Sequence, residues 1–122
     1  CFRSIQGYSK LGTYTGNGNA DGPFVYLGFR PAWFMLKRTD STNDWIIFDS
    51  KRDGSQNPIA DYLFANTNAA ENADTERGDF FSNGVKIRST AAAFNASGGT
   101  YVYAAFAEQP FVTSGGVPCT AR

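Results

Sequence analysis

The feature that most limits the fold is the way the apolar residues are grouped into short runs separated by turn residues. Phe24–Leu27, Ala32–Lys37 and Trp45–Asp49 are such runs, and they are rich in aromatic and β-branched residues. These residue types suit the pleated surface of a sheet. Each run is too short for a stable helix, and Pro31 stands at the entrance of the second. The chain is therefore expected to be all-β.

Two antiparallel hairpins are predicted. Ala32–Lys37 and Trp45–Asp49 flank a polar turn, and both are apolar nearly throughout, which predicts central strands buried on both faces. Asp79–Phe81 and Val85–Arg88 are joined through Asn83-Gly84, a pair that favours a type I′ turn. The strand after this turn alternates between apolar and charged residues and predicts one solvent-exposed face.

Residues 50–77 differ from the rest, because they are polar and rich in Asn, Asp and Ala. Long connections of this kind are often functional. A short helix at Ala69–Ala73 and a short strand at Tyr62–Phe64 are its two candidates for regular structure. Thr100–Glu108 is the longest strand candidate. Residues 1–122 are thus predicted to form a single antiparallel β-sandwich, lectin-like or jelly-roll-like, with little or no helix.

Composition excludes several classes of function. Eleven basic and eleven acidic residues give a net charge of zero, which argues against a nucleic-acid-binding domain. No apolar run approaches the length of a membrane helix. The chain has no His, so a Ser-His-Asp or Cys-His centre cannot form and a zinc site is not expected. We expect no enzyme activity and no cofactor.

The acidic residues offer one alternative to this reading. Asp40, Asp44, Asp49 and Asp53 cluster in the sequence, and a pair of carboxylates could serve glycoside hydrolysis. Basic residues interleave with them, so we interpret them as an ion-paired surface. Asp49, Arg52 and Glu71 are predicted to form an ion-pair network that fixes the long connection to the sandwich.

Two further groups of residues are a candidate calcium loop and a candidate disulfide. Asn17–Gly22 matches the first half of a calcium loop, but its twelfth position is Gly28 rather than a Glu, so a β-turn without bound metal is expected. Cys1 and Cys119 lie at the two ends of the chain. They form a disulfide if the ends meet, and two free thiols are the alternative.

Recognition is expected on the loops of the sandwich. The connections Thr39–Asp44 and Lys51–Arg77 leave opposite ends of the strand between them, so they share a site only if the longer one folds back along the sheet. The longer one is the predicted ligand site, because its amides and phenol suit sugar hydroxyls. Trp33 and Trp45 are interpreted as core residues. The candidate ligand-binding residues are Asn57, Tyr62, Asn66 and Asn68.

A series of short motifs, in a specific order and spacing, covers nearly the whole chain. The motifs include Tyr14-Thr15-Gly16-Asn17-Gly18-Asn19-Ala20-Asp21-Gly22, Gly28-Phe29-Arg30-Pro31-Ala32, Phe48-Asp49-Ser50-Lys51-Arg52, Ser82-Asn83-Gly84 and Ala105-Phe106-Ala107-Glu108-Gln109-Pro110-Phe111. In these motifs the chain resembles the C-terminal domain of tail-fibre proteins from tailed bacteriophages, notably marine ones. That domain is itself distantly similar to lectin-like and SPRY-like sandwiches.

The resemblance implies a virion component near the host-contacting end of a fibre, trimeric, and the C-terminal piece of a longer fibre chain. It implies a receptor-binding module for a host surface glycan or protein. A purely structural module for fibre assembly, trimerisation or capsid decoration is the alternative. A glycan depolymerase is a third and weaker hypothesis. The resemblance supplies no catalytic residues, and the terminal cysteines are not part of its pattern.

Overall fold

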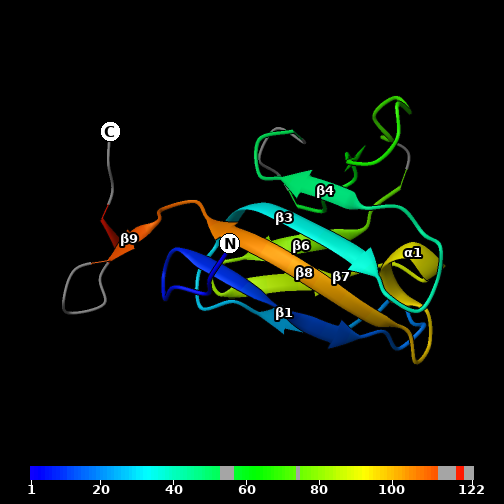
Figure 1. Ribbon diagram of the computed structural model, residues 1–122, viewed down its shortest axis with the longest axis horizontal. Coiled ribbons are helices and arrows are strands. Elements are labelled where there is room, and N and C mark those ends of the chain that lie inside the picture. Colours follow the sequence, from blue (N-terminus) through cyan, green and yellow to red (C-terminus); the bar gives the residue numbers. More distant parts are fainter. Residues whose placement is uncertain (53–56, 74, 113–117, 120–122) are drawn as a thin grey trace.

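Two antiparallel sheets pack face to face in the computed structural model, which describes residues 1–52, 57–73, 75–112 and 118–119 (Figure 1). The large sheet contains β1 (Ser9–Thr15), β8 (Thr100–Ala107), β3 (Pro31–Arg38), β4 (Ile46–Asp49) and β5 (Leu63–Phe64), in that spatial order. The small sheet contains β2 (Phe24–Tyr26), β7 (Gly84–Ile87) and β6 (Gly78–Phe81). A separate hairpin pairs β9 (Phe111–Val112) with β10 (Pro118–Cys119). The predicted all-β sandwich is confirmed.

Both predicted hairpins are present. β3 pairs antiparallel with β4, with Phe34 opposite Phe48. β6 pairs antiparallel with β7, but the turn between them is Ser82-Asn83, and Gly84 is the first residue of β7 without a positive φ, so the predicted type I′ turn at Asn83-Gly84 is wrong. Val85 and Ile87 are buried, while Lys86 on the other face is half-buried, as the alternating pattern predicted.

The core lies between the two sheets. The large sheet contributes Phe34, Leu36 and Tyr101, which are fully buried, and the small sheet contributes Phe80 and Val85. Neighbouring aromatic rings stack or meet edge to face, arrangements that stabilise beyond the burial of area alone. Phe34 and Tyr103 are stacked with ring centroids 5.6 Å apart.

Burial of β3 and β4 on both faces was predicted and is wrong. The small sheet covers only the inner face of the large sheet, where Phe34, Leu36 and Ile46 are buried. On the outer face Trp33 is half-buried and Trp45 is 38% exposed. A strand of nearly continuous apolar sequence is buried on both faces only when each face of its sheet is covered. In the described part of the chain, the small sheet covers the inner face of the large sheet, and the outer face is left partly exposed.

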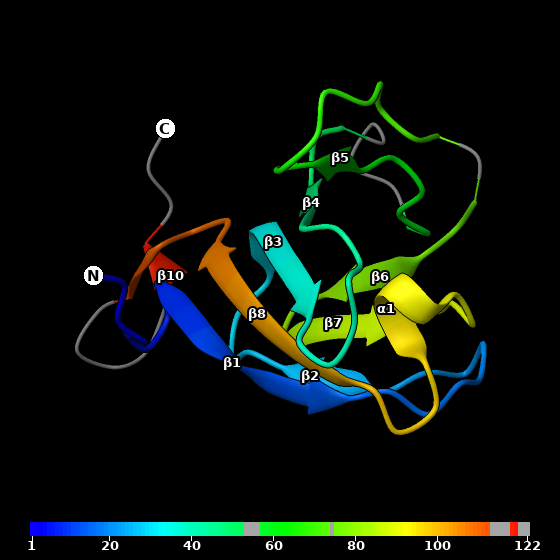
Figure 2. The ribbon, with the colours of Figure 1, turned by 45° about the vertical axis from the view of Figure 1, so that its right-hand side comes forward.

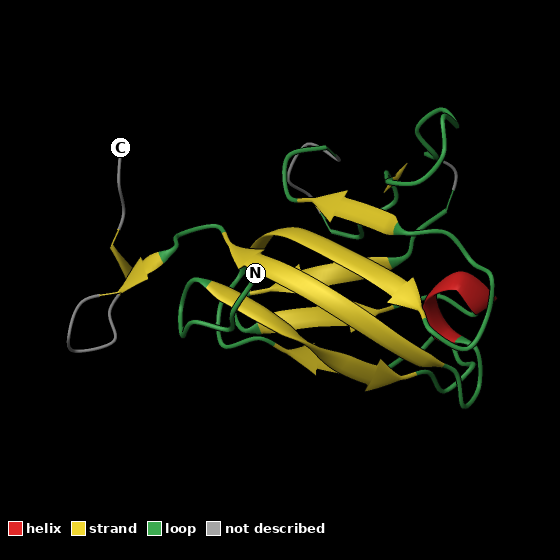
Figure 3. Ribbon diagram, in the orientation of Figure 1, coloured by secondary structure: helices red, strands yellow, loops and turns green. Residues whose placement is uncertain are grey.

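β1, the short helix α1 (Ala92–Asn95) and the β9–β10 hairpin were not predicted from the sequence. β1 forms one edge of the large sheet, although its sequence mixes polar residues and glycine. The helix α1 closes one end of the sandwich (Figure 3). It buries Phe94 in the core, where the ring packs against Phe48 at 5.8 Å between centroids.

The long connection after β4 folds back along the edge of the large sheet. β5 pairs with β4, with Ile47 opposite Leu63, and the chain then passes to β6 (Figure 2). This confirms the short strand predicted around Tyr62–Phe64, whereas Ala69–Ala73 is not helical. In the described residues, the structure contains no helix of the length and apolar character that crossing a membrane requires.

Candidate functional site

Tyr62, predicted to be an exposed ring for ligand stacking, is buried with 4% of its surface exposed. Its ring packs against Phe48, Phe64 and Phe94, with centroids 5.4–5.7 Å away. The Arg77 guanidinium lies 5.8 Å from the centroid of the same ring. The prediction is wrong because an aromatic residue inside a polar connection is what anchors that connection to the core.

The three asparagines predicted beside it do not form one surface with it. Asn57 exchanges two hydrogen bonds with the backbone of Phe80: its Nδ2 donates to the carbonyl at 2.8 Å, and its Oδ1 accepts from the N–H at 2.9 Å. Asn66 accepts from the Trp45 N–H and donates to Asp44 Oδ1, both at 2.9 Å. Asn68 is exposed. Asn66 therefore joins the two loop connections, because the longer one folds back along β4.

The predicted ion pairs among Asp49, Arg52 and Glu71 are present. Arg52 Nε contacts Asp49 Oδ2 at 2.9 Å, and its Nη1 contacts Glu71 Oε2. Asp49 Oδ1 also accepts from the backbone N–H groups of Lys51 and Arg52. The carboxylates raise the pKa of Arg52, the hydrogen bond that Arg52 donates to Glu71 being the largest cause. The network links the end of β4 to Glu71 in the long connection between β4 and β6.

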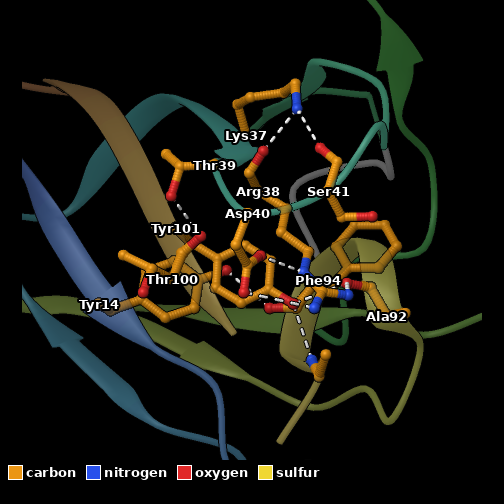
Figure 4. Close-up of polar contacts among 11 residues, drawn as sticks. Tyr14, Lys37, Arg38, Thr39, Asp40, Ser41, Ala92, Phe94, Thr100 and Tyr101 are labelled. Atoms are coloured by element: carbon orange, nitrogen blue, oxygen red, sulfur yellow. Dashed lines mark hydrogen bonds and ion pairs between the residues drawn. The ribbon is translucent and has the colours of Figure 1, made fainter. Parts of the chain in front are cut away.

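The described members of the acidic cluster each contact a neighbouring basic or amide side chain. Figure 4 shows the end of β3, where Arg38 Nε donates to Asp40 Oδ1 at 2.5 Å. This hydrogen bond holds the pKa of Asp40 below its usual range. Asp44 accepts from Asn66, and Asp49 belongs to the network above. Asp53 lies outside the described residues.

The Asn17–Gly22 loop is held by its own side chains and by a buried amide. Asn95 is completely buried; its Nδ2 donates to Asn17 Oδ1 and to the Asn19 carbonyl, and its Oδ1 accepts from the Asn17 N–H at 2.8 Å. Asp21 Oδ1 contacts Lys86 Nζ at 2.7 Å, which lowers the pKa of Asp21. The oxygens that a calcium ion would need are thus engaged in hydrogen bonds and an ion pair.

The terminal cysteines are only partly described. Cys1 is exposed and carries a free thiol. Cys119 lies in β10, but its side chain is outside the described part of the structure. Because Cys1 is free, it is not bonded to Cys119 in this structure, and the predicted disulfide is not present. Among the described residues no group of three or more His, Cys, Asp or Glu side chains is placed to hold a metal ion.

The most distinctive surface is the outer face of the large sheet. One cross-strand row runs over all its strands and is entirely apolar. Strand pairing sets its members side by side: Leu11 opposite Ala104, Ala104 opposite Met35, Met35 opposite Ile47, and Ile47 opposite Leu63. Each of these side chains is only partly buried. Sheets that face water usually carry polar residues on that side, so this apolar row departs from the usual pattern.

Aromatic rings and part of this row line a depression. The rings of Trp33 and Phe2 both pack against Phe106, with centroids 5.6 Å and 5.9 Å away. Trp45 lines the far end. The depression measures about 290 Å³ and is lined by apolar side chains almost throughout. We call the row and this depression the apolar face.

The apolar face suits protein contact better than chemistry or sugar binding. Exposed, contiguous apolar surface of this kind marks interaction sites. Sugar recognition requires hydrogen-bonding groups that can match hydroxyls, and the depression offers almost none. The sequence contained the signal, since the apolar runs of β3 and β4 were longer than a one-sided strand needs. It could not show that, in the described part of the chain, only their inner face is covered.

The fold and this face define the chain as an all-β sandwich domain with a partly exposed apolar outer face. A family model described as "Domain of unknown function (DUF7483)" matches residues 1–110. The chain belongs to this DUF7483 family. Searches of curated proteins and of solved structures found no match.

Proposed function

We propose that this domain is a non-enzymatic assembly module of a phage tail fibre, and that it works by contact rather than by chemistry. The phage setting and the virion localisation rest on the sequence resemblance. The lack of catalysis is supported by the acidic cluster, in which Asp40, Asp44 and Asp49 are each engaged by a neighbouring basic or amide group.

The observation that carries the contact role is the apolar face. Leu11, Met35 and Ile47 lie in one row, and Trp33 and Trp45 flank it. We take its occupant to be another copy of the chain, because the resemblance implies a homotrimer. Permanent subunit interfaces resemble a domain core cut in half, and they are richer in apolar and aromatic groups than other surfaces.

Sedimentation equilibrium over a range of concentrations tests this proposal. The wild-type chain is expected to associate, and Met35→Glu is expected to weaken association at least about tenfold, because burying an unpaired charge is costly. Asn68→Glu adds the same charge at an exposed position away from the face and should behave like the wild type. A wild-type chain that stays monomeric, or equal association of Met35→Glu, would contradict the assembly role.

Receptor binding is the second candidate function. It is favoured by a different surface, the outer face of the small sheet, where the rings of Phe24, Tyr26 and Phe81 are 40–63% exposed. These rings are not needed for the core. Adsorption of the domain to susceptible host cells, compared between wild type and Tyr26→Ala, tests this role separately from assembly.

A further inference from the structure

We propose that the outer face of the small sheet binds an uncharged oligosaccharide, through an aromatic platform formed by Phe24, Tyr26 and Phe81. This inference deepens the second candidate function and does not depend on the assembly role. Phe24 and Tyr26 project outward from β2, since Val25 between them is buried. Phe81 projects outward at the end of β6, where Phe80 is buried.

Glycine creates the platform. Gly84 lies in the middle strand, directly opposite both Tyr26 and Phe81. Because it has no side chain, the space above it is open to the Phe24 ring, and the backbones of Tyr26 and Phe81 on either side stand two strand spacings, about 10 Å, apart. A Cβ at Gly84 would come within 2.7 Å of the Phe24 ring and 2.2 Å of the Val25 carbonyl. The Phe24 ring thus lies over the space the glycine leaves, 6.1 Å from Phe81.

Polar depressions adjoin the platform at both ends. Beside Phe81, a depression of about 340 Å³ is lined by Asn57, Glu76, Asp79 and Arg88. Beside Tyr26, another of about 290 Å³ is lined in part by Gln6 and Lys10. A platform of exposed rings between two sets of hydrogen-bonding groups matches a sugar chain, whose rings present apolar C–H faces and a polar rim of hydroxyls.

The charges around the rings favour an uncharged ligand. Lys86 pairs with Asp21 at 2.7 Å, and Arg88 pairs with Asp79. Lys10 and Glu76, at opposite ends, carry opposite signs. The rim therefore has no excess of either charge to attract an acidic polymer. It also surrounds a small apolar area with ion pairs, unlike the continuous apolar face of the large sheet.

The test uses the full chain and two probes, cellohexaose and maltohexaose, followed by titration calorimetry and by saturation-transfer NMR. Cellohexaose has its ring substituents equatorial and exposes flat C–H faces, so it is expected to bind at millimolar or lower concentration. Tyr26→Ala and Phe81→Ala should each weaken binding about tenfold, as loss of one stacked ring does for other planar ligands. Both side chains are exposed, so the melting temperature should stay close to that of the wild type.

Thr42→Ala is the control, because it removes an exposed side chain in the β3–β4 connection, away from both proposed surfaces. It should leave sugar binding unchanged. Three results would overturn the proposal: neither hexasaccharide binds, binding survives in both platform variants, or Thr42→Ala abolishes it. If the platform variants instead lower self-association and neither sugar binds, the platform is a contact between copies and the proposal is wrong. None of these results alters the outcome of the Met35→Glu experiment.

Discussion

At the scale of single residues, one buried amide organises an end of the sandwich. Asn95 has no exposed surface, and it fastens the Asn17–Gly22 loop to the segment around Ser89, whose carbonyl accepts from Asn95 Nδ2 at 2.9 Å. Buried polar groups persist when their hydrogen bonds are satisfied and become costly when they are not. Asn95 meets that condition with both of its side-chain groups.

Replacing this amide should be strongly destabilising. Asn95→Ala is expected to lower the free energy of unfolding by about 2–4 kcal/mol, because several buried groups lose their partner together. Asn68→Ala, at an exposed position, should change it by less than about 0.5 kcal/mol. Urea denaturation of both variants measures the difference. A near-neutral Asn95→Ala would mean that water replaces the amide and that the loop is not held by it.

Tyr14 predicts how stability depends on alkaline pH. Its hydroxyl donates to the Phe94 carbonyl at 2.7 Å, and burial, followed by the neighbouring Tyr101, raises its pKa. The folded state therefore favours the neutral phenol, so this contribution is complete below the unfolded value of about 10 and declines as pH rises above it. Tyr14→Phe should show a shallower loss of stability above that pH. Tyr26→Phe, at an exposed position, is the control, and equal slopes in all three proteins would contradict the account.

At the scale of elements, strands with strong apolar or turn signals could be predicted and those without could not. The β3–β4 and β6–β7 hairpins were identifiable from their apolar runs and from Asn83-Gly84. β1 was missed because Gly12 and its polar neighbours obscure its alternation, although it pairs with β8 along its full length. α1 was missed because four residues carry no helical period.

Site residues were harder to predict, because sequence does not reveal which face of a strand is covered. Tyr62 looked exposed in its polar segment and is core, whereas Trp45 looked buried in its apolar run and is exposed. Phe24 and Tyr26 were recognised only as strand residues. The one local signal for the platform is Gly84, since glycine inside a strand often marks close approach of other groups.

The two faces of the large sheet should respond differently to truncation. Trp45→Ala is expected to cost about 1 kcal/mol, because its side chain is 38% exposed. Phe34→Ala removes a fully buried ring and should cost about 3–5 kcal/mol. Thermal or denaturant melting of the two variants makes the comparison. Equal costs would show that the outer face is packed in the free chain.

The ion network should act locally rather than globally. Glu71→Gln is expected to lower the free energy of unfolding by less than about 1 kcal/mol, since both partners are partly exposed. It should instead speed amide hydrogen exchange in residues 57–73, because Arg52 no longer ties that connection to β4. Asn68→Ala, in the same connection, is the control. Unchanged exchange in Glu71→Gln would rule out the proposed anchoring role.

At the scale of the whole molecule, a two-layer sandwich has two outer faces, and here they differ in chemistry. The large sheet presents the continuous apolar face, whereas the small sheet presents three rings among ion pairs. Protein surfaces that bind other subunits are apolar at their centre, and surfaces that bind sugars combine rings with polar groups. The proposed assembly role and the proposed recognition role thus fall on opposite faces of the sandwich.

The central claim, that copies of the chain associate through the apolar face, has intrinsic probes. The chain contains two Trp residues, and Trp33 and Trp45 both line that face. Tryptophan emission should therefore shift to shorter wavelength, and quenching by acrylamide should fall, over the same concentration range in which sedimentation detects association. Emission and quenching that stay unchanged while the chain oligomerises would show that subunits meet elsewhere and would contradict the account.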